Sequence, residues 1–332
     1  MLNFSQLPSI SKGKIAQLFS DLPVESLITD SRKTLGGLYA LFFAIKGDRH
    51  DGHIYIAEAY KSGVRQFVVE AWHHDYATFP DSNFFVADSS KATLHDLAIY
   101  KRNLAEIPVI AITGSNAKTI VKEWLSQLLV NEYVIVKSPK SYNSQIGVPL
   151  SVWQLNEKHT LGIFEAGISK MGEMESLQNI IKPTFGIFTN IGSAHDEGFA
   201  SKSSKINEKL KLFSKVDTLF YCGNHQEIDE QVNKLNLNTF TWAIDKKADV
   251  TALLVLKTNT KSVFRFKSQV KNLYSEFDLE LPFTDTASVE NLMHCIVVML
   301  FFNIDKSEIQ TRILGLKKLS MRLELKQGIN NT

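Results

Sequence analysis

The segment 107–119 combines residue types that could bind a nucleotide. A short apolar run leads into a polar stretch, and Lys118 and Thr119 then open a helical pattern. Backbone amides in such a loop attract phosphate oxygens, a lysine adds positive charge, and a threonine hydroxyl can bind Mg²⁺. The segment therefore predicts a nucleoside triphosphate site. The expected nucleotide-binding residues are Gly114, Ser115, Asn116, Ala117, Lys118 and Thr119.

Two positions depart from the usual phosphate-binding loop, which has glycine directly before the lysine and another glycine five residues earlier. This chain has Ala117 and Ile112 there. The context still favours the nucleotide site, because apolar residues follow at helical spacing after a short run rich in Ile and Val. The alternative is an ordinary strand-to-helix turn with a solvated lysine. A negative φ would tolerate the methyl of Ala117, whereas a positive φ would cost about 1 kcal/mol and crowd the nucleotide.

Polar residues also follow two later strands of the predicted sheet. Glu165 closes the run 161–164, and His195 comes shortly after the run 185–191. A carboxylate and an imidazole at neighbouring strand ends could bind one divalent ion, with Thr119 supplying an oxygen to a second ion. Taken singly, the glutamate has a simpler interpretation as a solvated residue and the histidine as a structural one.

Three further polar segments could bind an anionic substrate. Residues 141–149 form a polar loop that enters a helix, for which a plain turn with an N-cap is the equal alternative. Residues 30–33 and 44–53 place basic and hydrogen-bonding groups at strand ends, which suits a diphosphate, although charged turns alone produce similar strings. The candidate substrate-binding residues are Ser31, Arg32, Lys46, Asp51, His53, Asn143 and Ser144.

The elements that must position these residues form an α/β pattern. Residues 1 to about 105 alternate short strands and helices, and residues 107–242 continue this alternation strictly, with short connections. The pattern predicts a parallel sheet covered on both faces, with ligands beyond the carboxyl ends of its strands. Residues 249–281 instead predict successive strands in an antiparallel appendage, before helices over 286–302 and 305–314.

The expected elements can be given by residue range. Strands are expected over 26–28, 40–45, 66–69, 84–86, 107–112, 133–136, 161–166, 185–190, 217–221, 238–242, 251–257, 262–267 and 275–281. Helices are expected over 56–62, 91–103, 118–130, 147–154, 172–181, 203–214 and 226–234 in addition to the two C-terminal ones.

Composition limits the possible classes of function. A length of 332 residues predicts two or more domains. The net charge of +2, without a basic block, gives nucleic-acid binding no electrostatic support. The longest apolar stretch, 295–302, is too short to span a membrane, and the N-terminus lacks the features of a signal peptide. The two cysteines predict no disulfide framework, so we expect a cytoplasmic protein. The charge and the length of the apolar stretches lead us to expect no nucleic-acid partner and no membrane partner.

Four motifs occur in an order that resembles the Mur ligases of peptidoglycan synthesis, and among them the branch that adds D-alanyl-D-alanine. They are Thr-Gly-Ser-Asn-x-Lys-Thr at 113–119, Ser-Tyr-Asn-Ser-Gln-Ile-Gly-Val-Pro at 141–149, Glu-Ala-Gly-Ile-Ser at 165–169 and Thr-Asn-Ile-Gly-Ser-Ala-His at 189–195. The segment 30–53 is similar to the UDP-binding domain of that branch. The resemblance covers nearly the whole chain.

The resemblance implies a domain order and a reaction. A UDP-substrate-binding domain would cover 1–105, a P-loop-type ATP-binding domain 106–315, and the start of a C-terminal domain 316–332. The implied cofactors are ATP and Mg²⁺, and the implied substrates are UDP-N-acetylmuramoyl-tripeptide and D-alanyl-D-alanine. The γ-phosphoryl group would move to the tripeptide carboxylate, and the amine would then attack the acyl phosphate.

The C-terminal residues carry an expectation of their own. Residues 322–332 predict a strand, a turn at Gly328 and the start of a returning strand. By the resemblance, a third domain would begin near Met321, so we expect a fragment that binds the UDP-muramoyl peptide and ATP without completing ligation. Some similar ligases continue further, into an alanine racemase domain.

The resemblance also implies roles for individual residues. Lys118 would bind phosphate, and Thr119, Glu165 and His195 would bind metal. Lys209 falls where these ligases carry a carbamylated lysine near the second Mg²⁺; without the resemblance it is simply a surface helix lysine. The expected catalytic residues are therefore Lys118, Glu165, His195 and Lys209.

Asn291 matches an asparagine that these ligases use near adenine. The His-Asn pair that usually precedes it is replaced here by Ala287 and Ser288. The contacts to adenine at this point are therefore expected to differ from those of similar ligases.

Three other functions remain open. A sister ligase would add a different amino acid. A folylpolyglutamate-synthase-like ligase would share the ATPase core, but the N-terminal segment of UDP-binding type argues against it. A non-catalytic nucleotide-binding module would explain Ala117 as decay of the loop, although the presence of Glu165, His195 and Lys209 argues against such decay.

Overall fold

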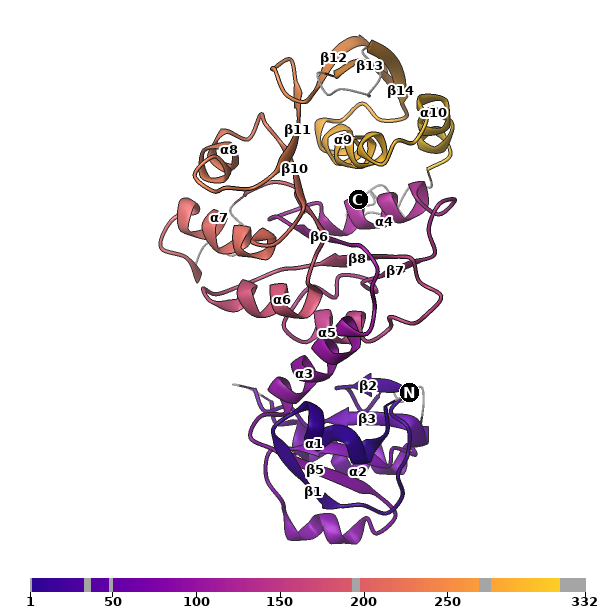
Figure 1. Ribbon diagram of the computed structural model, residues 1–332, viewed down its shortest axis with the longest axis vertical. Coiled ribbons are helices and arrows are strands. Elements are labelled where there is room, and N and C mark those ends of the chain that lie inside the picture. Colours follow the sequence, from indigo (N-terminus) through magenta and orange to yellow (C-terminus); the bar gives the residue numbers. More distant parts are fainter. Residues whose placement is uncertain (1, 33–36, 48–49, 193–197, 269–275, 317–332) are drawn as a thin grey trace, which may run out of the picture. The chain divides into compact units, whose positions relative to one another are not determined.

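The computed structural model describes residues 2–32, 37–47, 50–192, 198–268 and 276–316 (Figure 1). The chain divides into two compact units, each assembled from several segments. The first comprises Met1–Ala111, Val134–Phe185 and His195–Val216, and the second comprises Ile112–Tyr133, Gly186–Ala194 and Asp217–Thr332. The domain limits expected at residues 105 and 315 stay a prediction.

A five-stranded sheet in the first unit has the strand order β1-β5-β4-β3-β2. Its strands are β1 (Gly13–Gln17), β2 (Ser26–Ile28), β3 (Ala40–Phe43), β4 (Gln66–Val69) and β5 (Asn83–Ala87). Strands β2 to β5 are parallel, and β1 pairs antiparallel with β5. Every residue of β3 and β4 is buried, as is typical of a parallel sheet covered on both faces.

Helices α1 (Leu7–Ile10), α2 (Ile56–Lys61) and α3 (Ser90–Asn103) pack on this sheet. Further helices follow in the first unit, namely α5 (Gly147–Val152), α6 (Glu173–Ile181) and α7 (Lys202–Leu210). The 3-10 turns are η1 (Phe4–Gln6), η2 (Gly37–Tyr39), η3 (Gly52–Tyr55), η4 (His74–Thr78) and η6 (Lys211–Phe213). Helices α3, α5 and α6 pack against one another (Figure 1).

Nine strands form a second sheet in the order β14-β13-β12-β11-β10-β9-β6-β8-β7. They are β6 (Val109–Thr113), β7 (Ile135–Lys137), β8 (Leu161–Glu165), β9 (Phe185–Phe188), β10 (Thr218–Cys222), β11 (Thr239–Ile244), β12 (Val250–Lys257), β13 (Ser262–Ser268) and β14 (Glu276–Leu281). The pairs β7–β8, β10–β11 and β11–β12 are parallel, whereas β12, β13 and β14 are antiparallel. The predicted α/β fold with an antiparallel appendage is confirmed.

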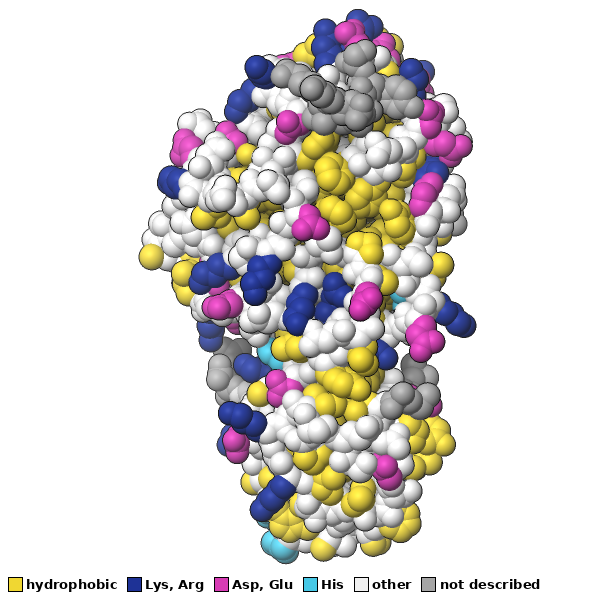
Figure 2. All heavy atoms as spheres, viewed as in Figure 1, with side chains coloured by type: hydrophobic (Ala, Val, Ile, Leu, Met, Phe, Trp, Pro, Cys, Tyr) yellow, Lys and Arg dark blue, Asp and Glu magenta, His cyan; other side chains and the backbone are white. Residues whose placement is uncertain are grey.

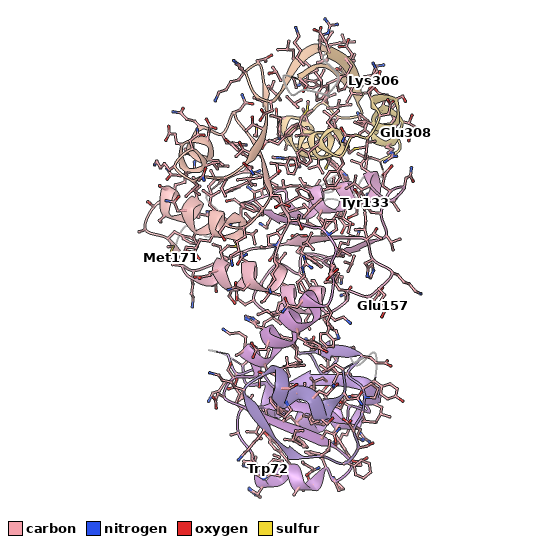
Figure 3. The ribbon with its side chains drawn as sticks, in the orientation of Figure 1. Trp72, Tyr133, Glu157, Met171, Lys306 and Glu308 are labelled. Carbon is pink, nitrogen blue, oxygen red and sulfur yellow. The ribbon has the colours of Figure 1, made fainter. Side chains whose placement is uncertain are left out.

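Among the described residues of the second unit, the helices are α4 (Lys118–Leu128), α8 (Gln226–Val232), α9 (Thr286–Phe301) and α10 (Lys306–Leu314). Helix α9 is buried along most of its length and packs against α4, β10 and β11. Helix α10 is tied to the end of α4, because Arg312 donates to the Leu128 carbonyl at 2.8 Å and pairs with Glu132. Figure 3 labels Glu308, which lies on α10 beside Arg312.

The surface shows no segregation of charge on the face drawn in Figure 2. Acidic and basic side chains are interspersed there, with hydrophobic side chains between them. Within the part of the chain that the structure describes, no helix combines the length and hydrophobicity needed to cross a membrane.

Candidate active site

The predicted nucleotide loop follows β6, precedes α4 and is held by the residues after β9, within the second unit. The amides of Ser115 and Asn116 donate to the backbone and side-chain oxygens of Asn190, at 2.9 and 3.0 Å. The Thr189 hydroxyl donates to the Asn116 carbonyl at 2.7 Å. These bonds preorganise the loop. They also use two of the amides that we expected to be directed outward, and sequence reasoning did not assign that role to Asn190.

Two residues of this loop have a positive φ. Gly114 has a φ of 148°, and a Cβ at this position would collide with the Thr189 hydroxyl, so only glycine fits. Ala117 has a φ of 69°, in the left-handed region. A methyl group there costs about 1 kcal/mol. Of the two backbone conformations considered for Ala117, negative φ and positive φ, the structure has the unfavourable positive one.

The ammonium group of Lys118 is held against the loop that precedes it. Its Nζ donates to the carbonyls of Gly114 at 2.7 Å and Ser115 at 3.3 Å. Lys122, one turn further along α4, is fully buried and lies 3.1 Å from a carboxylate oxygen of Glu123. Sequence reasoning missed Lys122, since its spacing resembles that of any helix lysine. Lys118 is therefore the cationic side chain at the start of α4, whereas the charge of Lys122 is offset by Glu123.

Glu165 ends β8 in the first unit and is completely buried. Asn143 donates to one of its carboxylate oxygens at 3.4 Å, and the Asn143 carbonyl accepts from the Gly167 amide at 2.7 Å. The structure therefore brings together two of the predicted site residues. A buried carboxylate needs donors or a cation to offset its desolvation. A carboxylate beside an amide side chain offers the oxygen ligands that a divalent cation such as Mg²⁺ prefers.

Ser144 has a structural role in the same polar loop. Its hydroxyl oxygen accepts from the Gly147 amide at 3.2 Å and from the Ile146 amide at 3.4 Å, at the start of α5. The turn that we gave as the alternative for this segment is thus present. Substrate binding by Ser144 stays a prediction.

Lys209 lies on α7 and is only 4% exposed, so its interpretation as a surface lysine is wrong. Its neighbour Glu208 is also buried and accepts from the amides of Gly172 at 2.8 Å and Met174 at 3.2 Å. A carboxylate at these amides stabilises the N-terminus of α6. Glu208 also pairs with Lys211 at 2.7 Å. These contacts of Glu208 anchor α7 to the start of α6 and so fix the face of α7 on which Lys209 lies. Sequence reasoning missed them.

Lys46, Asp51 and His53 come together in the N-terminal segment. Lys46 and Asp51 form an antiparallel bridge, and His53 Nδ1 lies 2.6 Å from Asp51 Oδ1. His53 Nε2 accepts from the Glu70 amide at 3.0 Å, so Nδ1 carries the proton and both ring nitrogens bind protein groups. The amide and the ring of His53 hold the pKa of Asp51 below its usual value. His53 therefore shapes this loop.

Arg32 and Ser31 differ in their exposure. The Arg32 guanidinium binds both carboxylate oxygens of Asp30, at 2.9 and 3.0 Å, while its side chain remains 82% exposed. Ser31 is buried. The Arg32 side chain is therefore accessible to an anion from solution.

The candidate residues are divided between the two units. Lys118, Thr119 and the buried Asn291 belong to the second unit, whereas Glu165 and Lys209 belong to the first. His195 lies outside the described residues. The joint action of these residues stays a prediction.

Comparison with known proteins shows the family to which the chain belongs. Residues 112–299 match the model of the Mur ligase middle domain. A Bacillus subtilis protein named UDP-N-acetylmuramoyl-tripeptide–D-alanyl-D-alanine ligase is 28% identical over 321 residues, which cover 95% of this chain and 67% of that protein. A Haemophilus influenzae protein of the same name is 26% identical over 299 residues, which cover 88% of this chain and 63% of that protein. The chain thus spans about two thirds of the length of these relatives.

The fold is also similar to that of solved structures. A crystal structure of MurF from Acinetobacter baumannii aligns with a TM-score of 0.82 at 22% identity, covering 98% of this chain and 70% of that one.

Proposed function

Because this chain belongs to the Mur ligase family, we propose that it acts in the ATP-dependent joining of D-alanyl-D-alanine to UDP-N-acetylmuramoyl-tripeptide. Relatives similar along most of the chain are named for that reaction. A MurF from Thermotoga maritima with a similar fold was crystallised with ADP. The observation that carries the proposal is the loop 113–119, preorganised on Asn190 with the Lys118 ammonium group held against it.

The proposed reaction activates a carboxylate before the amide bond forms. A free carboxylate is a poor electrophile, so the γ-phosphoryl group of ATP moves to the terminal carboxylate of the tripeptide and ADP is released. The amine of D-alanyl-D-alanine then attacks the carbonyl carbon, the amide bond forms, and phosphate leaves. Lys118 offsets the negative charge of the phosphates. The protein contributes mainly position and charge.

Mg²⁺ is the metal that we propose for this site, with Thr119, Glu165, His195 and Lys209 as the residues that hold it. When bound, it would neutralise charge on the phosphate oxygens. The hydroxyl and carboxylate groups are the oxygen donors that Mg²⁺ prefers. We propose that Lys209 is carbamylated: its side chain is buried, and a carbamate there would supply oxygen donors.

Calorimetry with ADP and Mg²⁺ tests the nucleotide half of the proposal. We expect saturable binding by the chain and at least a tenfold weaker affinity in Lys118→Ala, because the ammonium group at the loop is lost. Lys202→Ala is the control, since Lys202 is exposed on α7. Equal affinities in Lys118→Ala and the parent chain would contradict the assignment of the loop.

Binding of UDP-N-acetylmuramoyl-tripeptide, followed by competition with other UDP-muramoyl peptides, tests the substrate half. We expect the tripeptide form to bind most tightly. Preference for a shorter UDP-muramoyl peptide would instead favour a sister ligase that adds a different amino acid.

The left-handed conformation of Ala117 favours one alternative, a nucleotide-binding module without catalysis. The same calorimetry separates the two. Nucleotide binding that appears only after Ala117→Gly would indicate an impaired loop, whereas binding by the parent chain supports the ligase proposal.

A further inference from the structure

Three consecutive residues in the loop between β4 and β5 place metal-ligand atoms close together. The ligand atoms of His73, His74 and Asp75 all lie within 4.8 Å of one another. Over the described ranges, this is the one group of three or more such side chains that meets that spacing. All three residues are exposed at the start of η4, next to Trp72, which Figure 3 labels. We refer to these three residues as the His-His-Asp turn.

Both imidazoles of the His-His-Asp turn lie against the Asp75 carboxylate. His73 Nδ1 accepts from the Asp75 amide at 3.4 Å. The same nitrogen lies 3.2 Å from Asp75 Oδ2, and His74 Nε2 lies 2.8 Å from Asp75 Oδ1. One carboxylate is therefore flanked by two imidazole nitrogens. Two imidazole nitrogens and a carboxylate oxygen at this spacing are close enough to coordinate one cation.

The turn rests on the aromatic core of the sheet. Trp72 packs edge-to-face on Tyr76 and on Phe84 of β5, with ring centroids 5.7 and 5.8 Å apart. Tyr76 in turn stacks on Phe84 at 4.9 Å. The Thr78 hydroxyl donates to the Asp75 carbonyl at 2.6 Å. These contacts preorganise the backbone that carries the three ligand side chains.

We propose that the His-His-Asp turn binds a divalent transition-metal ion such as Zn²⁺ or Cu²⁺. Two imidazoles and one carboxylate are ligands that these ions favour, and three protein ligands leave a position open to water. Mg²⁺ favours all-oxygen sites, so the turn selects against the metal of the nucleotide reaction. The site lies in the loop between β4 and β5 and does not depend on the proposed ligase activity.

Fluorescence and calorimetry of the intact chain with the metal alone test this site. Trp72 is 42% exposed, whereas Trp124, Trp153 and Trp242 are 3%, 7% and 1% exposed, so bound Cu²⁺ should quench Trp72 selectively. We expect one saturable Zn²⁺ site with micromolar affinity in calorimetry. His73→Ala and His74→Ala should each weaken Zn²⁺ binding at least tenfold, because each removes one of three ligands.

His159→Ala is the matched control, because His159 lies on another loop. This variant should bind Zn²⁺ with the same affinity as the parent chain. Trp72→Phe should keep Zn²⁺ binding in calorimetry and lose the Cu²⁺ quenching. Thermal unfolding without metal should be unchanged in the two histidine variants of the turn, since both side chains are exposed. Zn²⁺ binding that survives in His73→Ala combined with His74→Ala, or that is abolished by millimolar Mg²⁺, would overturn the proposal.

Discussion

Ala117 carries conformational strain in the nucleotide loop. Its φ of 69° lies where an L-residue with a Cβ is disfavoured by about 1 to 2 kcal/mol. Ala117→Gly should therefore raise the free energy of unfolding by about 0.5 kcal/mol, after the greater flexibility of unfolded glycine is subtracted. The same change should tighten ADP binding, because it removes the methyl group from the loop. Urea unfolding and calorimetry measure the two effects.

Ala92→Gly is the control for this substitution. Ala92 is exposed in the helix α3, where glycine should lower the free energy of unfolding by about 1 kcal/mol. The two substitutions should therefore act with opposite signs. A loss of stability in Ala117→Gly as large as that in Ala92→Gly would show that the left-handed conformation carries no strain.

Single residues differ in how far their roles could be predicted. The sequence places Glu165 at a strand end, and the structure confirms that position. The burial of Lys209 could not be predicted from spacing, because it depends on Glu208 and on the position of α6, far from it in the sequence. The role of Asn190 was equally hidden, since the pattern does not reveal which backbone amides a side-chain oxygen will accept from.

At the scale of elements, Arg102 joins α3 to the end of α6. Its Nε donates to the Ile181 carbonyl at 2.8 Å and its Nη2 to the Lys182 carbonyl at 3.1 Å, and the residue is only 8% exposed. These carbonyls lie at the C-terminus of α6, where helices lack internal donors. Arg102→Leu should lower the free energy of unfolding by about 3 kcal/mol, because buried carbonyls lose charged donors.

The controls for Arg102 separate hydrogen bonding from charge. Arg102→Lys keeps the charge but provides fewer directed donors, so it should lose about half as much stability in urea unfolding. Lys91→Ala, at an exposed site of the same helix, should change the free energy of unfolding by less than about 0.5 kcal/mol. A small effect of Arg102→Leu, similar to that of Lys91→Ala, would show that α6 does not depend on this residue.

Most elements follow from the sequence because their apolar spacing is local. Strands β2 and β4 match the predicted ranges, and α9 ends within one residue of its predicted limit. Strand β1 was missed, since its residues Gly13–Gln17 are mostly exposed and lack a regular apolar alternation. Its strand conformation depends on antiparallel pairing with β5, some 70 residues away, which no local pattern reports.

At the scale of the whole molecule, the two units are interleaved along the chain. Each contains three segments, so neither corresponds to a continuous stretch of sequence. The boundary expected near residue 105 follows from the alternation of strands and helices and from the resemblance; it divides the chain only once and stays a prediction. Each compact unit depends on contacts between segments that are far apart in the sequence. A local sequence pattern does not reveal such contacts.

Stability of the whole molecule should depend on pH through its buried histidines. Burial lowers the pKa of His294 from 6.5 to about 4, and His294 Nδ1 accepts from Trp242 Nε1 at 3.2 Å. As the pH falls below 6.5, the unfolded chain binds a proton that the folded chain does not bind. The free energy of unfolding should therefore decrease, by about 2 kcal/mol between pH 7 and pH 5. Burial also lowers the pKa of His95 and of His159, which adds to the same slope.

Urea unfolding of His294→Asn at pH 7, 6 and 5 tests this origin of the slope. Asparagine keeps an oxygen that can accept from Trp242 but does not titrate, so stability should decrease less with falling pH than in the parent chain. Carboxylates with lowered pKa, such as Asp51 and Glu132, lose their contribution only as the pH falls below about 4.5, outside this range. His74→Asn, at an exposed residue, should keep the parent slope. Parallel pH profiles for His294→Asn and the parent chain would place the proton uptake elsewhere.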